Sequence, residues 1–524
     1  MSNVKEQIEE LLSDPLLLLK KKPFWRGTSL GTKPSICGKD IELNAKIDAY
    51  LPYIRKTAVS QDQFMQELDA DSHDVLNDQN IPQITMKVDK GYVEIKYKKM
   101  ALPIQRLIRD KKVLHLCGND TVFTLLNTNP TDKQTEDFIR FKQLWMDRNM
   151  DGMRTKFIST QMSYGDAGLL FYFDYKGRCK ARLLSYEYGY VICSHNDENG
   201  DRILESVFYH SGDSDYIDSY DDTYMYRYVR TINGDSVYDN TWQMLPPVRH
   251  GFSEIPLVTK RGKVAWDSVQ TLIEVYEVVY NIFMVIMKRH GWGILYIKGQ
   301  FSDEGKKIAG AIVLNDRSLD GSGSAEFKQA PSPEGMLQAL QSLEESIQKG
   351  SGCTIILPKD ISMSGDVSGV AVEIAQSLDN ETALQGAIEW QNAISKMQRL
   401  AQEGFAKELV ATGEKEFETA VTDFQNLKIG AKLKPWKPRS ETEYNNMLIA
   451  LKGSGGISED TLIEKNTESS PDEKVRRQKE KEEALILQEK QLTLQSSSNN
   501  GGGGSNADSN GGNTSNKTNT NKKK

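Results

Sequence analysis

Aspartate is the residue type whose grouping in this sequence most resembles a reactive site. The stretch Asp213–Asp222 reads DSDYIDSYDD, and Asp166 and Asp174 precede it. Carboxylates attract hard divalent cations, so one hypothesis is a metal-dependent nucleic-acid enzyme, such as a nuclease or nucleotidyltransferase. Aspartate is also favoured in turns, where its side chain bonds to nearby backbone amides. We favour turns between strands for these residues and keep the enzyme as the alternative.

The histidines and cysteines lack the spacing of metal ligands. The odd number of cysteines and the absence of a CxxC pair argue against a disulfide framework or a zinc knuckle and fit a reducing compartment. The sequence contains no GxxxxGKS/T phosphate loop, no HExxH helix and no GxSxG elbow. We therefore expect no metal, no cofactor and no enzymatic activity. The residues considered are His73, His115, His195, His210, His250, His290, Cys37, Cys117, Cys179, Cys193 and Cys353.

Three alternating tyrosines, Tyr224, Tyr226 and Tyr228, could stack on bases as aromatic platforms do in single-strand binders. Such a binder also needs a basic groove, and only Arg227 and Arg230 accompany these tyrosines. Alternation of this kind is typical of a strand with one buried face. We expect a half-buried strand.

The charge balance limits the nucleic-acid contact that is possible. Hydrophobic residues make up 38% and charged residues 27% of the 524 residues, and the formal net charge is −7. Residues 492–524 carry four lysines and one aspartate, which leaves about −10 for the rest. Tight phosphate binding needs a strongly basic face. If DNA is a partner, the protein must pass it through rather than grip it.

Neither secretion nor membrane insertion is indicated. The N-terminus, MSNVKEQIEELL, lacks the basic-then-apolar pattern of a secretory signal. The longest uncharged apolar run, Val278–Met287, is about half of the ~20 residues that a membrane-spanning helix needs. We expect no membrane partner and a protein that stays in the cytoplasm where it is made.

The elements expected in the first half of the chain form a mixed α+β domain. Short helices within residues 1–60 precede a hairpin in Ile84–Tyr97, and a helix follows from about Thr135 to Arg154. The expected strands lie within Gly165–Ile192, with a turn at Asp174–Gly177, and at Glu205–Tyr209 and Tyr224–Ile232.

The second half is dominated by long helices around a small β-rich module. A helix ending near His290 has apolar side chains at steps of three and four: Leu272, Ile273, Tyr276, Tyr280 and Phe283. We expect this apolar stripe to be core or a subunit interface. Strand candidates follow within 291–332, and a second helix runs from Pro333 to Gly350. After a polar loop, a third helix is expected from about Gly369 to Leu409. Strands within 415–434, short helices and a disordered polar tail complete the chain.

Four passages in a fixed order point to one family. They are the strand pair in SYGDAGLLFYFDYKGRCKARLLSYEYGYVI, Ile255–Val258 before a helix, the Asp366–Ala371 motif, and Gly456–Ser458 after a helix. Together they resemble the portal proteins of tailed bacteriophages, above all siphophages of Gram-positive hosts. The most specific motif contains Ser368, Gly369, Val370 and Ala371, at the start of the long helix. One departure is Glu274, which stands where the family has aspartate.

The resemblance implies an α+β portal-type fold assembled as a cyclic ring, with a wing, a long helical stem, a small β-rich clip and a short helical crown. Its expected parts are an N-terminal helical arm (1–60), the wing (61–265), a stem helix (266–290), the clip (291–332), a second stem helix (333–352), a tunnel loop (353–366), a long tunnel-side helix (367–410), wing return strands (411–440), short crown helices (441–491) and a disordered tail (492–524).

The resemblance also implies a function, which is to form the channel at one capsid vertex for DNA packaging and ejection. The expected partners are further copies in a dodecameric ring, double-stranded DNA, the terminase large subunit, major capsid and scaffold proteins, and later head–tail adaptor proteins. The alternative within the virion is another structural protein. The residues expected to face moving DNA in the tunnel loop are Lys359, Asp360, Ser362, Ser364, Gly365 and Asp366.

Overall fold

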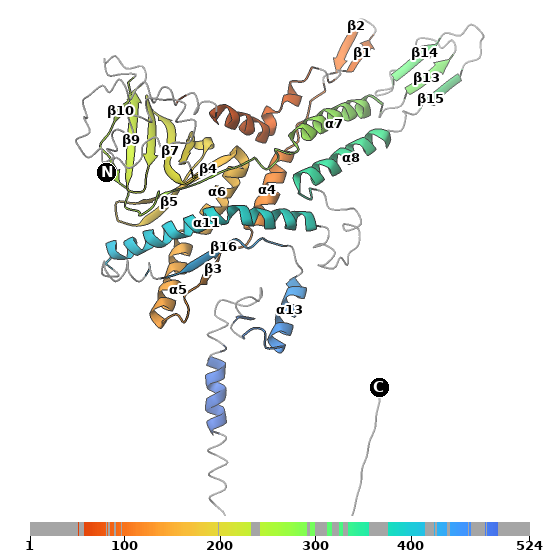
Figure 1. Ribbon diagram of the computed structural model, residues 1–524. Coiled ribbons are helices and arrows are strands. Elements are labelled where there is room, and N and C mark those ends of the chain that lie inside the picture. The colour runs from red at the N-terminus through yellow and green to blue at the C-terminus, as the bar shows by residue number, and fades with distance from the viewer. Residues whose placement is uncertain are drawn as a thin grey trace, which may run out of the picture. The chain divides into compact units, whose positions relative to one another are not determined.

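The computed structural model describes the following residues: 51, 57–79, 81, 84–88, 91–95, 97–196, 199–231, 241–290, 294–298, 312–316, 324–328, 334–355, 376–413, 424, 427–437, 441–458, 461–462, 477 and 479–490. The chain divides into two compact units, Met1–Pro438 and Arg439–Lys524. In the first unit, helices and strands are mixed, as the α+β prediction requires (Figure 1).

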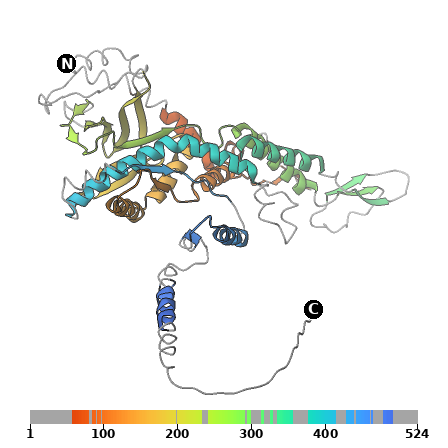
Figure 2. The same cartoon turned by 60° about the horizontal axis from the view of Figure 1, so that its bottom comes forward.

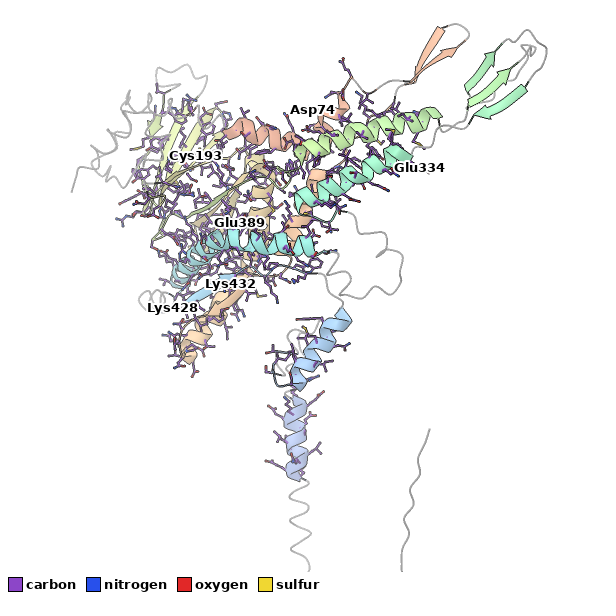
Figure 3. The ribbon with its side chains drawn as sticks, turned by 45° about the vertical axis from the view of Figure 1, so that its right-hand side comes forward. Asp74, Cys193, Glu334, Glu389, Lys428 and Lys432 are labelled. Atoms are coloured by element: carbon purple, nitrogen blue, oxygen red, sulfur yellow. The ribbon has the colours of Figure 1, made fainter. Side chains whose placement is uncertain are left out.

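The largest sheet of the first unit is antiparallel and six-stranded. Its order is β10-β9-β8-β7-β6, and β11 also pairs with β9. Alternate side chains of this sheet enter one hydrophobic cluster, which contains Tyr226, Tyr228, Trp242 and Cys193 (Figure 3). Tyr224–Tyr228 therefore form the half-buried strand that was predicted. The strands are β6 (Val191–Asn196), β7 (Arg202–Ser211), β8 (Ser214–Tyr220), β9 (Tyr224–Thr231), β10 (Gln243–Met244) and β11 (Val248–Arg249).

The interpretation of Asp213–Asp222 as turns was wrong, because most of this stretch is strand β8. Asp218 receives two hydrogen bonds from Arg227 on β9, at 2.7 and 2.8 Å. Asp215 pairs with Arg230 at 2.7 Å. Each carboxylate is therefore neutralised across the strand pair, which lets it lie in the sheet. The D-x-x-D pattern conceals a strand because the partner arginines come 9 and 15 residues later.

A second sheet supports the long helix of this unit. It has the order β12-β4-β5, from Leu257–Arg261, Asp166–Phe173 and Cys179–Leu184. The β4–β5 hairpin turns where predicted, and Gly177 takes a positive φ of 74° there. Helix α11 (Ser377–Ala411) lies along this sheet and over β16 (Ile429–Lys432), which pairs with β3 (Val122–Leu125) (Figures 1 and 2).

Helix α11 approaches β5 closely because residue 404 has no side chain. A Cβ atom on Gly404 would lie 2.2 Å from the Sγ atom of Cys179. One turn later, the buried Glu408 accepts a hydrogen bond from the backbone N–H of Cys179 at 3.0 Å and pairs with Arg148. Around this contact lie Phe141, Phe157, Phe171, Trp390 and Phe405, which belong to the largest hydrophobic cluster of the described residues.

The helix predicted from Thr135 to Arg154 is two helices, so its boundaries were wrong. Helix α5 (Asp132–Asp147) starts with a capping box formed by Thr131 and Gln134, and α6 spans Met150–Tyr164. Between them, Asn149 takes a left-handed conformation with φ 49°, which no α-helix continues through. Asparagine tolerates this conformation better than most residues, and its place inside an apolar pattern hid the break.

Two long helices bracket a small three-stranded sheet, as the sequence predicted. Helix α7 (Gln270–His290) precedes the strands and α8 (Glu334–Ser351) follows them. The sheet order is β14-β13-β15, from Ile312–Asp316, Ile294–Lys298 and Ser324–Lys328. β13 runs parallel to β14 and antiparallel to β15. The hairpin of β1 (Ile84–Val88) and β2 (Gly91–Ile95) also lies where expected.

The second unit is described by itself. Helix α13 (Glu441–Gly453) is followed by Ser458, whose hydroxyl oxygen accepts a hydrogen bond from the N–H of Thr461 at 3.2 Å, the predicted helix cap. Residues 479–490 form a further helix.

Candidate functional site: the base of the helix pair

The five apolar residues predicted as an interface on the first long helix gather at its contact with the second. Leu272, Ile273, Tyr276, Tyr280 and Phe283 all belong to or pack against one cluster that also contains Leu340 and Ile347 of α8. The hydroxyl of Tyr276 donates to Glu344 at 2.5 Å, and that of Ser268 donates to the carbonyl of Gly350 at 2.8 Å. These two contacts show that α7 and α8 run antiparallel, side by side (Figures 1 and 2).

A second seam of α7 is polar and buried. Glu277 is 3% exposed and Asn281 is fully buried. Glu277 Oε1 accepts hydrogen bonds from His73 Nδ1 at 2.8 Å and from the backbone N–H of Leu102 at 2.7 Å. Asn281 bonds to both the N–H and the carbonyl of Met100, at 2.8 and 2.7 Å. We call these five residues the polar clasp; they join α7 to two segments far earlier in the chain.

The geometry of the polar clasp determines the charge of His73. Its Nδ1 faces the carboxylate of Glu277, and its Nε2 faces the carbonyl oxygen of Glu67 at 2.8 Å. Both partners accept hydrogen bonds, so both ring nitrogens donate when the ring is an imidazolium ion, and this site favours that form. Burial by itself lowers the pKa of His73, but the hydrogen bond and charge of Glu277, the carbonyl of Glu67 and the charge of Asp69 together outweigh burial, and the pKa is raised.

The C-terminal end of α8 is hydrogen-bonded to the start of α11. The backbone N–H of Thr354 donates to Asp379 at 3.0 Å, and the Thr382 hydroxyl donates to the carbonyl of Gly352 at 3.0 Å. Gly352 has a positive φ of 68°, which directs the chain out of α8. The segment between these bonds is thus held at both ends, from Thr354 to Asp379.

The predicted tunnel-loop and helix-start residues fall within this segment. Residues 356–375 lie outside the described residues, and helix α11 as described begins at Ser377. The structure therefore describes the hydrogen bonds that hold the two ends of the segment. The roles of the residues between these ends stay predictions. The residues concerned are Lys359, Asp360, Ser362, Ser364, Gly365, Asp366, Ser368, Gly369, Val370 and Ala371.

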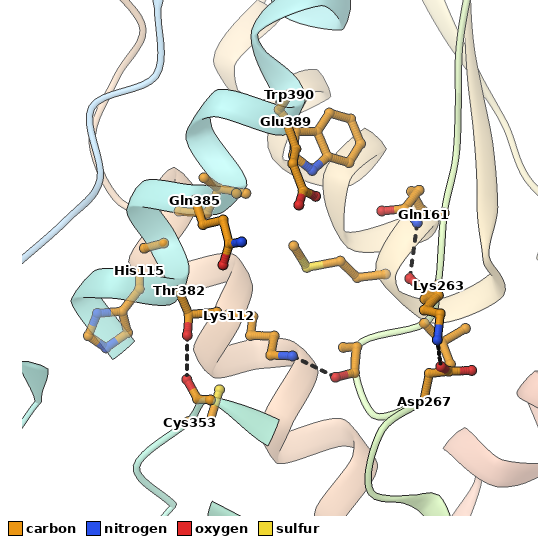
Figure 4. A pocket seen from close by; sticks show the side chains of 18 of the residues that line it. Lys112, His115, Gln161, Lys263, Asp267, Cys353, Thr382, Gln385, Glu389 and Trp390 are labelled. Atoms are coloured by element: carbon orange, nitrogen blue, oxygen red, sulfur yellow. Dashed lines mark hydrogen bonds and ion pairs between the residues drawn. The ribbon is translucent and has the colours of Figure 1, made fainter. Parts of the chain in front are cut away.

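A cavity of about 400 Å³ lies beside these anchors (Figure 4). Gln385 and Glu389 of α11 point into it from one side, and Lys112 of α4 (Ile104–Cys117) lies opposite. Lys112 donates to the carbonyl of Ala265 at 2.7 Å, and burial lowers its pKa. Burial raises the pKa of the Cys353 thiol to about 12, so this sulfur is protonated at neutral pH and a poor nucleophile.

The structure gives no candidate metal site among the described residues. Among them there is no group of three or more histidine, cysteine, aspartate or glutamate side chains that could hold a metal ion. The carboxylates of β8 that motivated the enzyme hypothesis are paired with arginines, as shown above. The helix pair, which carries a small sheet and is held at its base by the polar clasp and by the bonds to α11, is the candidate functional element.

Helix α7 is long and apolar. By length and apolar character alone, Gln270–Lys288 would suffice to cross a membrane, and 28% of this span is buried inside the protein. The same span contains Glu277 and Asn281, whose polar groups are bonded to other parts of the protein. Its half-buried apolar side chains include Tyr280 and Phe283, which pack toward α8.

An α+β unit that carries two long helices around a small sheet is the architecture expected for a subunit of a phage DNA channel. Residues 48–486 match the family described as phage portal protein, SPP1 Gp6-like. The chain belongs to this family and is a portal protein of a tailed bacteriophage, a component of the virion that serves the packaging of DNA into the capsid. No curated protein matches the chain.

Proposed function

We propose that copies of this chain assemble into a closed cyclic ring, a dodecamer in the capsid, whose central channel passes double-stranded DNA during packaging and ejection. The single observation that carries the proposal is the family match over residues 48–486. The two antiparallel helices support it, because a ring of head-to-tail contacts needs repeated elements with two different faces.

In this ring, α7 and α8 form the stem, and the β14-β13-β15 sheet forms the clip. The clip docks the terminase large subunit, whose ATPase supplies the energy that this chain, with no phosphate-loop sequence, does not generate. Head–tail adaptor proteins later take the same end, and the wing contacts major capsid and scaffold proteins. The protein is made in the host cytoplasm and acts at the portal vertex, without a membrane partner.

The segment 353–366 is the tunnel loop in this proposal. DNA must slide in both directions, so the wall should avoid deep electrostatic traps and contacts that read sequence. An acidic chain with isolated lysines, such as Lys359, meets this requirement. The bonds from Thr354 to Asp379 and from Thr382 to Gly352 hold the start of this loop beside the start of α11, and the loop shifts with the passing grooves.

Exposed apolar side chains on α7 and α11 are candidates for subunit contacts. Val275 is 50% exposed, Leu384 is 59% exposed and Ile388 is 73% exposed. We assign Leu384 and Ile388 on one subunit, and Val275 on its neighbour, to the head-to-tail contact of the ring.

Electron microscopy of the purified protein tests the proposal. Rings with a central hole wide enough for a DNA duplex are expected, alone or after addition of scaffold or capsid protein. Persistent monomers at high concentration under all these conditions would overturn it. Filaments or closed shells would instead favour a different structural role in the virion.

A further inference from the structure

The strongest feature outside the helix pair is a row of lysines on one exposed sheet face. Lys428, Lys432 and Lys434 alternate with Leu427, Ala431 and Leu433 along β16 and its continuation. The apolar set is buried in the main hydrophobic cluster, and the three lysines are exposed. Because side chains of a strand alternate between its faces, the lysines share the outer face. Figure 3 labels two of them, Lys428 and Lys432.

The charges of this row are little compensated. None of the three lysines forms an ion pair with another residue in the part of the chain that the structure describes. On the neighbouring strand β3, the exposed residues Val122, Thr124 and the adjacent Leu126 are uncharged. Asp120 lies two residues before Val122, and by extension of the register it stands across from Lys434. The row therefore carries a local excess of two to three positive charges on a chain whose net charge is −7.

The spacing of the row fits a linear polyanion. At about 3.3 Å per residue in a strand, the Cα atoms of Lys428 and Lys432 lie about 13 Å apart, and those of Lys432 and Lys434 about 7 Å apart. Lysine is a flexible point charge that binds phosphate without reading bases. Protein interfaces, in contrast, are depleted in lysine and enriched in arginine, tyrosine and tryptophan, and strands β16 and β3 contain none of the three.

We propose that the outer face of the β16–β3 sheet binds the phosphate backbone of double-stranded DNA, at a place separate from the tunnel loop. The contact is independent of sequence and weakens with salt, because each phosphate neutralised releases a counterion. This proposal rests on the proposed function in one respect, which is that the bound DNA is the genome being packaged. For a portal protein, such a face gives DNA that lies against the subunit a weak holding point, while DNA in the channel remains free to slide.

The test uses the full-length protein and closed circular duplex DNA, which has no end to thread into a channel. The variant Lys428→Gln/Lys432→Gln/Lys434→Gln removes the row. The control, Lys176→Gln/Lys263→Gln/Lys349→Gln, removes the same charge from three scattered exposed sites, two of them ion-paired. Binding is measured as a function of NaCl concentration.

We expect the slope of log K against log salt to fall in magnitude by about 2 to 3 in the row variant, for each subunit in contact, and to change little in the control. Equal slopes for the row variant and the wild type would overturn the proposal. So would an unchanged DNA slope accompanied by loss of ring formation, which would assign the face to a contact between neighbouring subunits. Ring formation by electron microscopy separates this failure from failure of the proposed function.

Discussion

Replacing Glu277 with Gln should loosen the attachment of α7 to the residues that precede α4. The substitution keeps the shape of the side chain and an oxygen that can accept from Leu102, but it removes the charge that His73 requires. A hydrogen bond to a charged group contributes about 1.5–3 kcal/mol, and removing one partner of a buried ion pair costs about 3–5 kcal/mol. Since the amide retains part of the bonding, we expect local opening to become easier by about 2–4 kcal/mol.

Amide hydrogen exchange of the peptides that cover residues 97–104 measures this opening directly, because the N–H groups of Met100 and Leu102 donate into the polar clasp. A change of about 2–4 kcal/mol corresponds to a loss of protection of roughly 30- to 700-fold, at about 1.4 kcal/mol per factor of ten. His210→Gln is the matched control. His210 also pairs with a carboxylate, Asp215 at 3.0 Å, but its side chain is 57% exposed, so its loss should cost less than about 1 kcal/mol.

The same clasp predicts a dependence on pH with a defined sign. The folded pKa of His73 is raised above its unfolded value of about 6.5, so between the two values the folded state binds more protons than the open state. The stabilisation is therefore complete below about pH 6.5 and is lost as the pH rises through the folded pKa. Protection of residues 97–104 that is equal at low and high pH, and unaffected by Glu277→Gln, would refute this reasoning.

Three further predictions have defined outcomes. Gly404→Ala should lower the melting temperature, because overpacking against the sulfur of Cys179 costs about 1–3 kcal/mol. The control Gly386→Ala on the same helix, where the nearest atom is 3.5 Å away, should be neutral or stabilising. Removal of residues 492–524 should leave folding and ring formation intact in electron micrographs, since this tail lacks apolar residues for a core. Lys359→Glu and Gly365→Val should spare ring assembly but reduce genome packaging, through phosphate repulsion and backbone stiffness respectively; wild-type yields for both in a packaging assay would remove the tunnel loop from the path of DNA.

Periodic apolar patterns predicted the architecture of the chain well. The helix–sheet–helix order of α7, the small sheet and α8 follows from apolar spacing and from glycine and proline boundaries, which are local signals. The two errors concern features that an apolar pattern does not show. The break at Asn149 depends on the left-handed conformation of one residue. Strand β8 depends on arginines of the next strand that neutralise Asp215 and Asp218.

The polar clasp was also missed, although a signal for it exists. Glu277 and Asn281 interrupt an otherwise apolar helix at positions i and i+4, so both lie on one side of it. Polar residues at such positions are solvent-facing in most amphipathic helices, and only their partners, which lie 175 to 204 residues earlier, show that these are buried.

The two seams of α7 fix its register against different neighbours. Toward α8, Tyr276 and Tyr280 belong to or pack against the apolar cluster, and Tyr276 donates to Glu344 at 2.5 Å. Apolar contacts by themselves tolerate a shift of one turn, because another apolar residue can enter the same space. Glu277 and Asn281 do not tolerate it, because a shift would leave a buried carboxylate and a buried amide without partners. In the proposed ring the small sheet docks a partner, so it must be held in a fixed position relative to the rest of the subunit. Four hydrogen bonds that Glu277 and Asn281 form with His73, Met100 and Leu102 tie α7, the helix that precedes this sheet, to those earlier segments.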